Sequence, residues 1–253
     1  MNSNIFVKII VLIFSLSSLP GILICQKGVI EKNSKRLLSQ SFSPLIGQNK
    51  NIYAVITGIS DYQSTKIPDL QFADQDAFEF ANWLQSPEGG NVPTENIKLI
   101  TNRNATLIAF GNALQQLQDS IKEGDLALIY FSGHGDMETK TYYQFGFLLC
   151  YDSPPNNYKC GAYAVPFLQD IVSTISNKKA KVILITDACH AGKLAGDAIG
   201  GTKETARMLA QRFANEIKIM SCQPDETSAE GVHWGGGRGV FSYYLEKGLN
   251  GMA

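Results

Sequence analysis

From Asn51 onward, short apolar runs alternate with segments whose apolar residues recur at helical spacing. The apolar runs predict strands at residues 52–56, 97–100, 126–131, 142–150, 182–185 and 217–220. Steps of three and four between apolar residues predict helices at residues 73–84, 107–121, 165–175, 206–213 and 241–249. Buried strands separated by amphipathic helices are typical of a parallel sheet covered on both faces, so the predicted fold class is α/β.

A different pattern precedes this domain. Residues 5–24 are nearly all apolar, and a polar segment rich in Ser and Lys follows. This order is typical of a secretory signal peptide, predicted over residues 1–25, with residues 26–50 as a linker or pro-segment and 51–253 as the domain. The protein is then exported. The alternative is a retained membrane anchor, because the apolar stretch approaches the ~20 residues that span a bilayer.

Composition and charge exclude several classes of protein. The chain has 253 residues, of which 44% are hydrophobic, so it can bury a sizeable core. The 22 basic and 23 acidic residues nearly cancel. A broad nucleic-acid surface needs a clear excess of basic residues, so we expect no nucleic-acid partner.

Two predicted strands end in reactive residues. His134 follows the strand at 126–131 after Ser132 and Gly133, and Cys189 follows the strand at 182–185 after Asp187. Sites in open α/β sheets form beyond the carboxyl ends of the strands, which would bring both side chains to one cleft. A thiol is nucleophilic as the thiolate, and a nearby histidine can accept its proton. The pattern predicts a His134/Cys189 dyad.

Neighbouring groups complete this candidate site. Backbone N–H groups near Gly133 and Cys189 would hold an oxyanion. His190 is the alternative base, although its side chain diverges from that of the adjacent Cys189. We expect no Cys/His metal site, because no cysteine pair has ligand spacing.

Carboxylates indicate the substrate. Asp76 falls on the apolar face of its predicted helix, and Asp187 lies two residues before Cys189. A buried carboxylate needs a partner, and the sequence shows no obvious cation for either. Two acids at one cleft would suit a cationic side chain, with the Ser132 hydroxyl in the same pocket. The alternative for Asp76 is a local cap or pair, and Asp74 is expected to be solvated.

The cysteines leave one question open. Cys150 and Cys160 flank a loop that contains two prolines and two asparagines. In an exported protein they could close this loop as a disulfide, and the alternative is two buried free thiols.

These residues resemble those of the caspase-like cysteine peptidases, in particular the metacaspase and bacterial caspase-homologue branch. The resemblance spans about residues 51 to 250. It rests mainly on the segments 131–135 (FSGHG) and 187–192 (DACHAG), supported by segments 53–59, 70–77, 221–230 and 239–245.

The resemblance implies a three-layer sandwich with a mostly parallel six-stranded sheet and a His134/Cys189 dyad. It also implies an acidic pocket of Asp76, Ser132 and Asp187, and hence cleavage of peptides or proteins after Arg or Lys. No cofactor is implied. Calcium activates many metacaspases, but no adjacent acidic pair stands near Asp152, so calcium dependence is not expected.

Three further expectations concern the rest of the domain. Self-cleavage is predicted in the segment after the nucleophile, at Lys193, Lys203, Arg207 or Arg212. Gly235–Gly237 would form a loop at the substrate groove, with Trp234 packing on substrate. Relatives commonly continue beyond the position of Ala253, which leaves open that the chain is a fragment of a longer protein. A catalytically silent binding module and a thioester-forming transferase or ligase are the alternative functions.

Overall fold

The computed structural model describes residues 51–137, 142, 145–155, 157–188, 205, 217–221 and 228–250. The predicted signal or anchor, the linker and the predicted helix at 206–213 lie outside this part of the chain. Within it, no helix is both long enough and apolar enough to cross a membrane.

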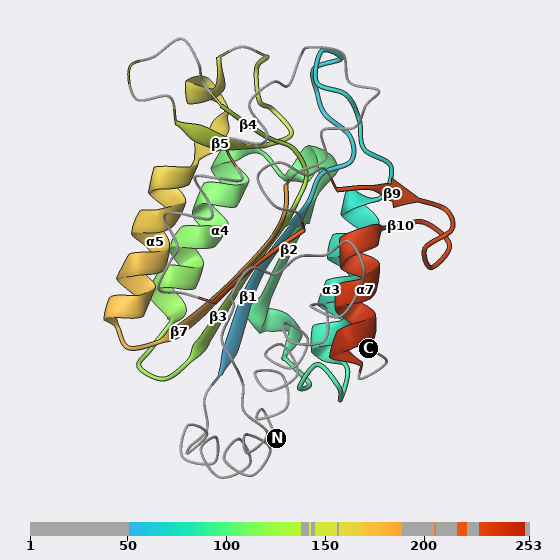
Figure 1. The fold of residues 1–253 in the computed structure, drawn as a ribbon. Helices are drawn as coiled ribbons and strands as arrows, with labels where there is room; N and C mark the ends of the chain where they lie inside the picture. Colours follow the sequence, from blue (N-terminus) through green and yellow to red (C-terminus); the bar gives the residue numbers. More distant parts are fainter. Residues whose placement is uncertain are drawn as a thin grey trace, which may run out of the picture.

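A parallel sheet forms the centre of the molecule (Figure 1). Its strands are β1 (Ile52–Gly58), β2 (Ile97–Thr101), β3 (Leu126–Ser132), β7 (Lys181–Asp187) and β8 (Ile217–Met220). Their order is β2-β1-β3-β7-β8, and every neighbouring pair is parallel. The predicted parallel α/β sheet is confirmed, and the described residues contribute five strands to it, where the resemblance implied six.

Helices cover both faces of this sheet, which makes the predicted three layers (Figure 1). The helices α4 (Leu107–Ser120) and α5 (Val165–Asn177) lie on one face. The helices α3 (Ala73–Gln85) and α7 (Val240–Leu249) lie on the other. Each was predicted to within two residues from its apolar periodicity.

The side chains of each central strand alternate between the two apolar clusters, one on each face of the sheet. On β3, Ile129 and Phe131 join the apolar cluster under α4 and α5, whereas Leu128 and Tyr130 join the cluster under α3 and α7. Successive side chains of a strand point to opposite faces, so a continuous apolar run is required when both faces are covered. Ser132, two residues after Tyr130, therefore belongs to the α3/α7 face.

Smaller elements gather beyond the carboxyl ends of the parallel strands (Figure 1). An antiparallel sheet contains β4 (Gly135–Met137), β5 (Gly146–Leu149) and β6 (Ala162–Ala164), and a hairpin contains β9 (Glu230–Gly231) and β10 (Arg238–Gly239). The short 3-10 turns η4 (Asn102–Asn104) and η5 (Tyr158–Cys160) also lie here, whereas η3 (Thr94–Asn96) precedes β2 at the amino ends of the strands. The strand expected at 142–150 is thus confined to β5.

The two cysteines of the proline-rich loop are not paired. Cys150 is buried and Cys160 is exposed, and both are free thiols, so the disulfide is wrong and the alternative of two buried thiols holds only for Cys150. Asp152 lies nearby, and its Oδ1 accepts the N–H of Leu107 at 2.8 Å, at the first residue of α4.

Candidate active site

One row of the sheet, at the carboxyl ends of three strands, places the first site residues. The register pairs Gly58 of β1 with Ser132 of β3, and Ser132 with Asp187 of β7. A Cβ atom on Gly58 would stand 2.2 Å from the carbonyl oxygen of Ala73, so only glycine lets the start of α3 approach the sheet this closely. The approach brings Asp76, on the first turn of α3, over this row.

The two predicted pocket carboxylates converge on Gly239. A Cβ atom added there would lie 2.6 Å from Asp76 Oδ2 and 3.1 Å from Asp187 Oδ2. Both side chains are buried. The carboxylates therefore come together, as the sequence predicted, but in a closed space around the start of α7.

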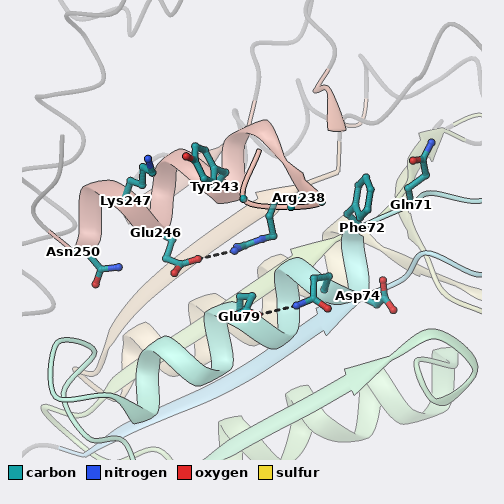
Figure 2. A pocket seen from close by; sticks show the side chains of 13 residues that line it. Gln71, Phe72, Asp74, Glu79, Arg238, Tyr243, Glu246, Lys247 and Asn250 are labelled. Atoms are coloured by element: carbon teal, nitrogen blue, oxygen red, sulfur yellow. Dashed lines mark hydrogen bonds and ion pairs between the residues drawn. The ribbon is translucent and has the colours of Figure 1, made fainter. Parts of the chain in front are cut away.

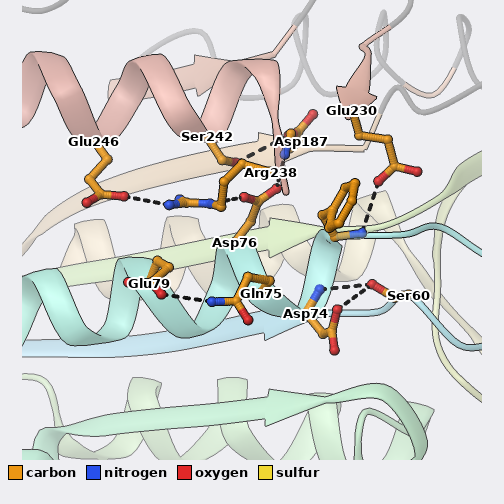
Figure 3. Close-up of polar contacts among 12 residues, drawn as sticks. Ser60, Asp74, Gln75, Asp76, Glu79, Asp187, Glu230, Arg238, Ser242 and Glu246 are labelled. Atoms are coloured by element: carbon orange, nitrogen blue, oxygen red, sulfur yellow. Dashed lines mark hydrogen bonds and ion pairs between the residues drawn. The ribbon is translucent and has the colours of Figure 1, made fainter. Parts of the chain in front are cut away.

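A cation already occupies this acidic site (Figure 3). Arg238 Nε donates to Asp76 Oδ1 at 2.5 Å, and Arg238 Nη1 donates to Glu246 Oε2 at 2.7 Å. The N–H of Gly239 donates to Asp76 Oδ2 at 2.9 Å. The expectation that neither carboxylate has a partner cation is wrong for Asp76, because β10 brings an arginine from 162 residues away.

Burial dominates the titration of Asp76 and raises its pKa to about 7. The hydrogen bond and charge of Arg238 act in the opposite direction, and the charge of Asp187 adds to the increase. A carboxyl in this setting ionises fully only when a cation stays beside it. The state of Asp76 thus depends on which cation is present.

Asp187 belongs to a hydroxyl chain under α7. Ser242 Oγ lies 3.3 Å from Asp187 Oδ2 and 2.7 Å from the hydroxyl of Tyr130. The Ser132 hydroxyl is fully buried on the same face, and no hydrogen-bond partner for it exists among the described residues. Sequence reasoning found Asp187 and Ser132 but missed Ser242 and Tyr130.

Neutral groups hold His134 in place. Its Nε2 lies 2.8 Å from the carbonyl oxygen of Pro68, and its backbone N–H donates to the hydroxyl of Tyr62 at 2.8 Å. The rings of Tyr62 and His134 are 5.2 Å apart. A carbonyl oxygen can only accept a hydrogen bond, so the Pro68 contact assigns the proton to Nε2 and the basic lone pair to Nδ1.

Main-chain hydrogen bonds attach the His134 loop to the end of β7. The N–H of Gly133 donates to the carbonyl of Asp187, and the N–H of Gly135 donates to the carbonyl of Ala188, both at 3.1 Å. The Gly133 amide is therefore already bonded, and its predicted oxyanion role requires that this hydrogen bond breaks. Cys189, the next residue after Ala188, lies outside the described residues.

The glycine-rich hairpin contributes to a different cavity. Gly235–Gly237 line a cavity of about 600 Å³ between α3 and α7, together with Phe72 and Tyr243 (Figure 2). Trp234, expected on substrate, is not among the lining residues. Its ring packs against Gly231 of its own hairpin, where a Cβ atom would lie 2.9 Å from it.

Polar contacts around the start of α3 were not predicted from the sequence. Glu230 accepts the N–H groups of Gln71 and Phe72 at 2.9 and 3.1 Å, where α3 begins. Asp74, expected to be solvated, accepts from Ser60 Oγ at 2.6 Å. Of these residues only Ser60 lies in the polar segment directly after β1, and no local pattern in the sequence links it to Asp74 or links Glu230 to α3.

Metal ligation has no candidate in this part of the chain. Among the described residues, no group of three His, Cys, Asp or Glu side chains is arranged to hold a metal ion. Asp76 and Asp187 bind protein groups instead.

A parallel sheet with a buried histidine and paired carboxylates at its carboxyl edge defines a caspase-like α/β protein. The chain belongs to the caspase domain family, because the family profile, Peptidase_C14, matches residues 52–253. The family supports cysteine peptidase chemistry, as the resemblance indicated.

Two solved structures are similar to the chain, and the first of them supports the fold alone. Protein GSU0716 from Geobacter sulfurreducens is 16% identical, with 80% of this chain and 83% of that chain covered and a TM-score of 0.56. The Bacillus subtilis protein YxiM is 13% identical over 80% of this chain and 56% of its own, with a TM-score of 0.35. No curated protein sequence matches the chain.

Proposed function

We propose that this protein is a cysteine endopeptidase that cleaves after Arg or Lys, with Cys189 as nucleophile and His134 as base. The convergence of Asp76 and Asp187 around Gly239 carries the proposal. Asp187 lies at the end of β7, directly before Ala188 and Cys189, and its carbonyl accepts the N–H of Gly133 beside His134. Asp76 reaches the same place from α3.

The chemistry follows from the protonation of His134. Nδ1 accepts the thiol proton of Cys189, and the thiolate forms a bond to the carbonyl carbon of the scissile peptide. The imidazolium then gives this proton to the leaving amine as the C–N bond breaks, which leaves an acyl-enzyme thioester. Water attacks the thioester, and His134 transfers the water proton to the departing sulfur. The carbonyl of Pro68 accepts the Nε2–H throughout, so the proton moves on and off the ring at Nδ1 alone.

In this proposal, backbone amides stabilise the oxyanion. The N–H groups of Cys189 and Gly133 are the proposed donors. Because the Gly133 amide bonds the Asp187 carbonyl, substrate binding must separate these two groups. Such a step would couple occupation of the acidic pocket to assembly of the oxyanion site.

Charge sets the specificity. A guanidinium or ammonium group beside Asp76 and Asp187 replaces its hydration with carboxylate contacts, and the buried Ser132 hydroxyl offers a further acceptor. An acidic side chain would face two carboxylates and lose its own hydration, which costs several kcal/mol (about 2 to 5). Peptides with Asp before the scissile bond are therefore excluded.

Paired fluorogenic peptides that end in Arg, Lys or Asp test this function. The full-length protein and its Cys189→Ala variant are compared with and without calcium. We expect hydrolysis after Arg and Lys, which the variant abolishes. Hydrolysis after Asp would refute the pocket and keep the dyad. Binding without hydrolysis would indicate a silent module, and transfer of the acyl group to an added amine would indicate a transferase.

Self-cleavage is part of the same proposal. The basic residues Lys193, Lys203, Arg207 and Arg212 follow the nucleophile in sequence, and the proposed specificity permits cuts after each. We expect purified wild-type protein to be cut at these sites and Cys189→Ala protein to stay intact, as measured by mass spectrometry. The same cuts in the purified variant would contradict self-processing.

A further inference from the structure

Arg238 spans the space between α3 and α7. Its guanidinium contacts Asp76 on one side and Glu246 on the other, and only 8% of its side chain is exposed (Figure 3). Asp76 is 1% exposed, whereas Glu246 is 32% exposed. The arginine therefore has one buried carboxylate partner and one partner near solvent.

The contact with Asp76 is chemically the one that a basic substrate would make. A substrate arginine would present the same guanidinium to the same carboxylate. Asp76 Oδ1 accepts from Arg238 and Oδ2 from the Gly239 amide. A second guanidinium at this buried carboxylate would stand beside the charge of Arg238, and repulsion between the two cations favours exchange. The Gly239 amide is fixed at the start of α7, whereas the Arg238 side chain can rotate.

We propose that Arg238 is an intramolecular competitor that occupies the acidic pocket until a basic substrate side chain replaces it at Asp76. This inference rests on the proposed function and adds a gate to it, by which we mean the exchange of Arg238 for the substrate cation at Asp76. Glu246 keeps hold of Arg238 after the exchange, so no guanidinium is left without a carboxylate.

The cavity between α3 and α7 gives the displaced side chain somewhere to go. It measures about 600 Å³, and both Arg238 and Glu246 line it, beside Tyr243 and Gly235–Gly237 (Figure 2). The Glu246 carboxylate lies toward the cavity and the Asp76 carboxylate toward the sheet. A rotation of Arg238 toward Glu246 thus opens Asp76 without a change in either helix.

Steady-state kinetics of Arg238→Gln on a peptide that ends in Arg tests the gate. The assay is run with the full-length protein at pH 9, above the pKa of about 7 that Asp76 has in the wild-type protein. Loss of the competitor should lower KM about tenfold, which corresponds to about 1.4 kcal/mol, and leave kcat within about twofold. Arg103→Gln makes the same chemical change at an exposed position and should leave KM unchanged.

The opposite result has a clear meaning. If Arg238 serves only to hold Asp76 in place, Arg238→Gln raises KM or leaves it unchanged, and the inference is overturned. If the wild-type protein cleaves no peptide after Arg or Lys, the proposed function itself fails, and the gate with it. Wild-type turnover therefore separates the two failures.

Glu246→Gln provides a second test that spares the pocket carboxylates. Without Glu246, Arg238 pairs with Asp76 alone and loses the partner that receives it after displacement. KM should then rise about threefold, opposite in sign to Arg238→Gln. An unchanged or lower KM would contradict the gate even if Arg238→Gln failed to fold.

Discussion

The two faces of the sheet differ in what lies under their helices. Under α4 and α5 the sheet packs against apolar side chains such as Phe110, Leu114 and Val172. Under α3 and α7 an apolar cluster of similar kind ends at the buried carboxylates Asp76 and Asp187. Both pairs of helices have the same periodicity. The comparison teaches that a charged residue within a helix's apolar stripe, and not the stripe itself, distinguishes the face that carries the candidate pocket.

Removing a large side chain from the apolar face should have the largest effect. Phe110 is fully buried and contacts the rings of Phe131 and Tyr163 at 5.7 and 5.0 Å. Phe110→Ala should lower the free energy of unfolding by about 4 kcal/mol, equally at pH 5 and pH 8, as measured by denaturant titration. Ile108→Ala, exposed on the same helix, should change it by less than about 0.5 kcal/mol. A pH-dependent loss at Phe110 would contradict the contrast between the faces.

The charged face should instead respond to pH. Asp76 ionises near pH 4 in the unfolded chain, whereas burial raises its folded pKa to about 7 against the effect of Arg238. Between these values unfolding releases a proton, so stability falls as pH rises from 4 to 7 and levels off above. The fall attributable to Asp76 should be about 3 to 4 kcal/mol.

Asp76→Asn is the control, because it removes the titrating group and keeps the shape. The groups around Asp76 are Arg238, Asp187 and the Tyr130 hydroxyl, and all three remain in this variant. Calorimetry at several pH values should show that the unfolding free energy of the wild-type protein falls relative to that of the variant as pH rises from 4 to 7. A constant difference would refute the raised pKa.

Ser242→Ala probes the hydroxyl chain with a smaller effect. The substitution leaves the buried Tyr130 hydroxyl and Asp187 Oδ2 without the hydroxyl that lies 2.7 and 3.3 Å from them. We expect a loss of about 2 kcal/mol in unfolding free energy, measured by denaturant titration. Ser120→Ala, at the exposed end of α4, should have no measurable effect. Equal stability of both variants would show that the hydroxyl chain is not needed.

The smallest expected change in stability is at Tyr62. Tyr62→Phe keeps the ring beside His134 and removes the hydroxyl that accepts the His134 amide. We expect a loss of about 1 kcal/mol in stability and a decrease of about tenfold in kcat with little change in KM. A change in KM alone would mean that Tyr62 acts on the substrate pocket and not as a positioning residue for His134.

Local sequence patterns predicted the three layers of the fold and the site residues that lie on α3 and at the strand ends. Alternation and helical spacing fix a residue's face, which is why α3 and the inward position of Asp76 could be read from the sequence. Strand ends likewise indicated His134 and Asp187, because parallel strands bring their carboxyl ends to one edge.

Contacts between distant loops could not be predicted in the same way. Arg238 follows three glycines and has no periodic neighbours, so nothing local indicates that it pairs with Asp76. Pro68 acts through its carbonyl oxygen, which every residue type has. Tyr62 lies in an irregular segment where side-chain direction follows no simple period. Only the three-dimensional arrangement identifies these partners.

The order of strands has a consequence for a nicked molecule. A single cut between β7 and β8 would leave β1, β2, β3 and β7 in one fragment and β8 with α7 in the other. The fragments would remain joined by the β7–β8 ladder, by Arg238 on Asp76 and by the hydrogen bond from the Trp83 indole to Asn250. Backbone cleavage there would therefore yield a non-covalent heterodimer whose acidic pocket is shared between two polypeptides.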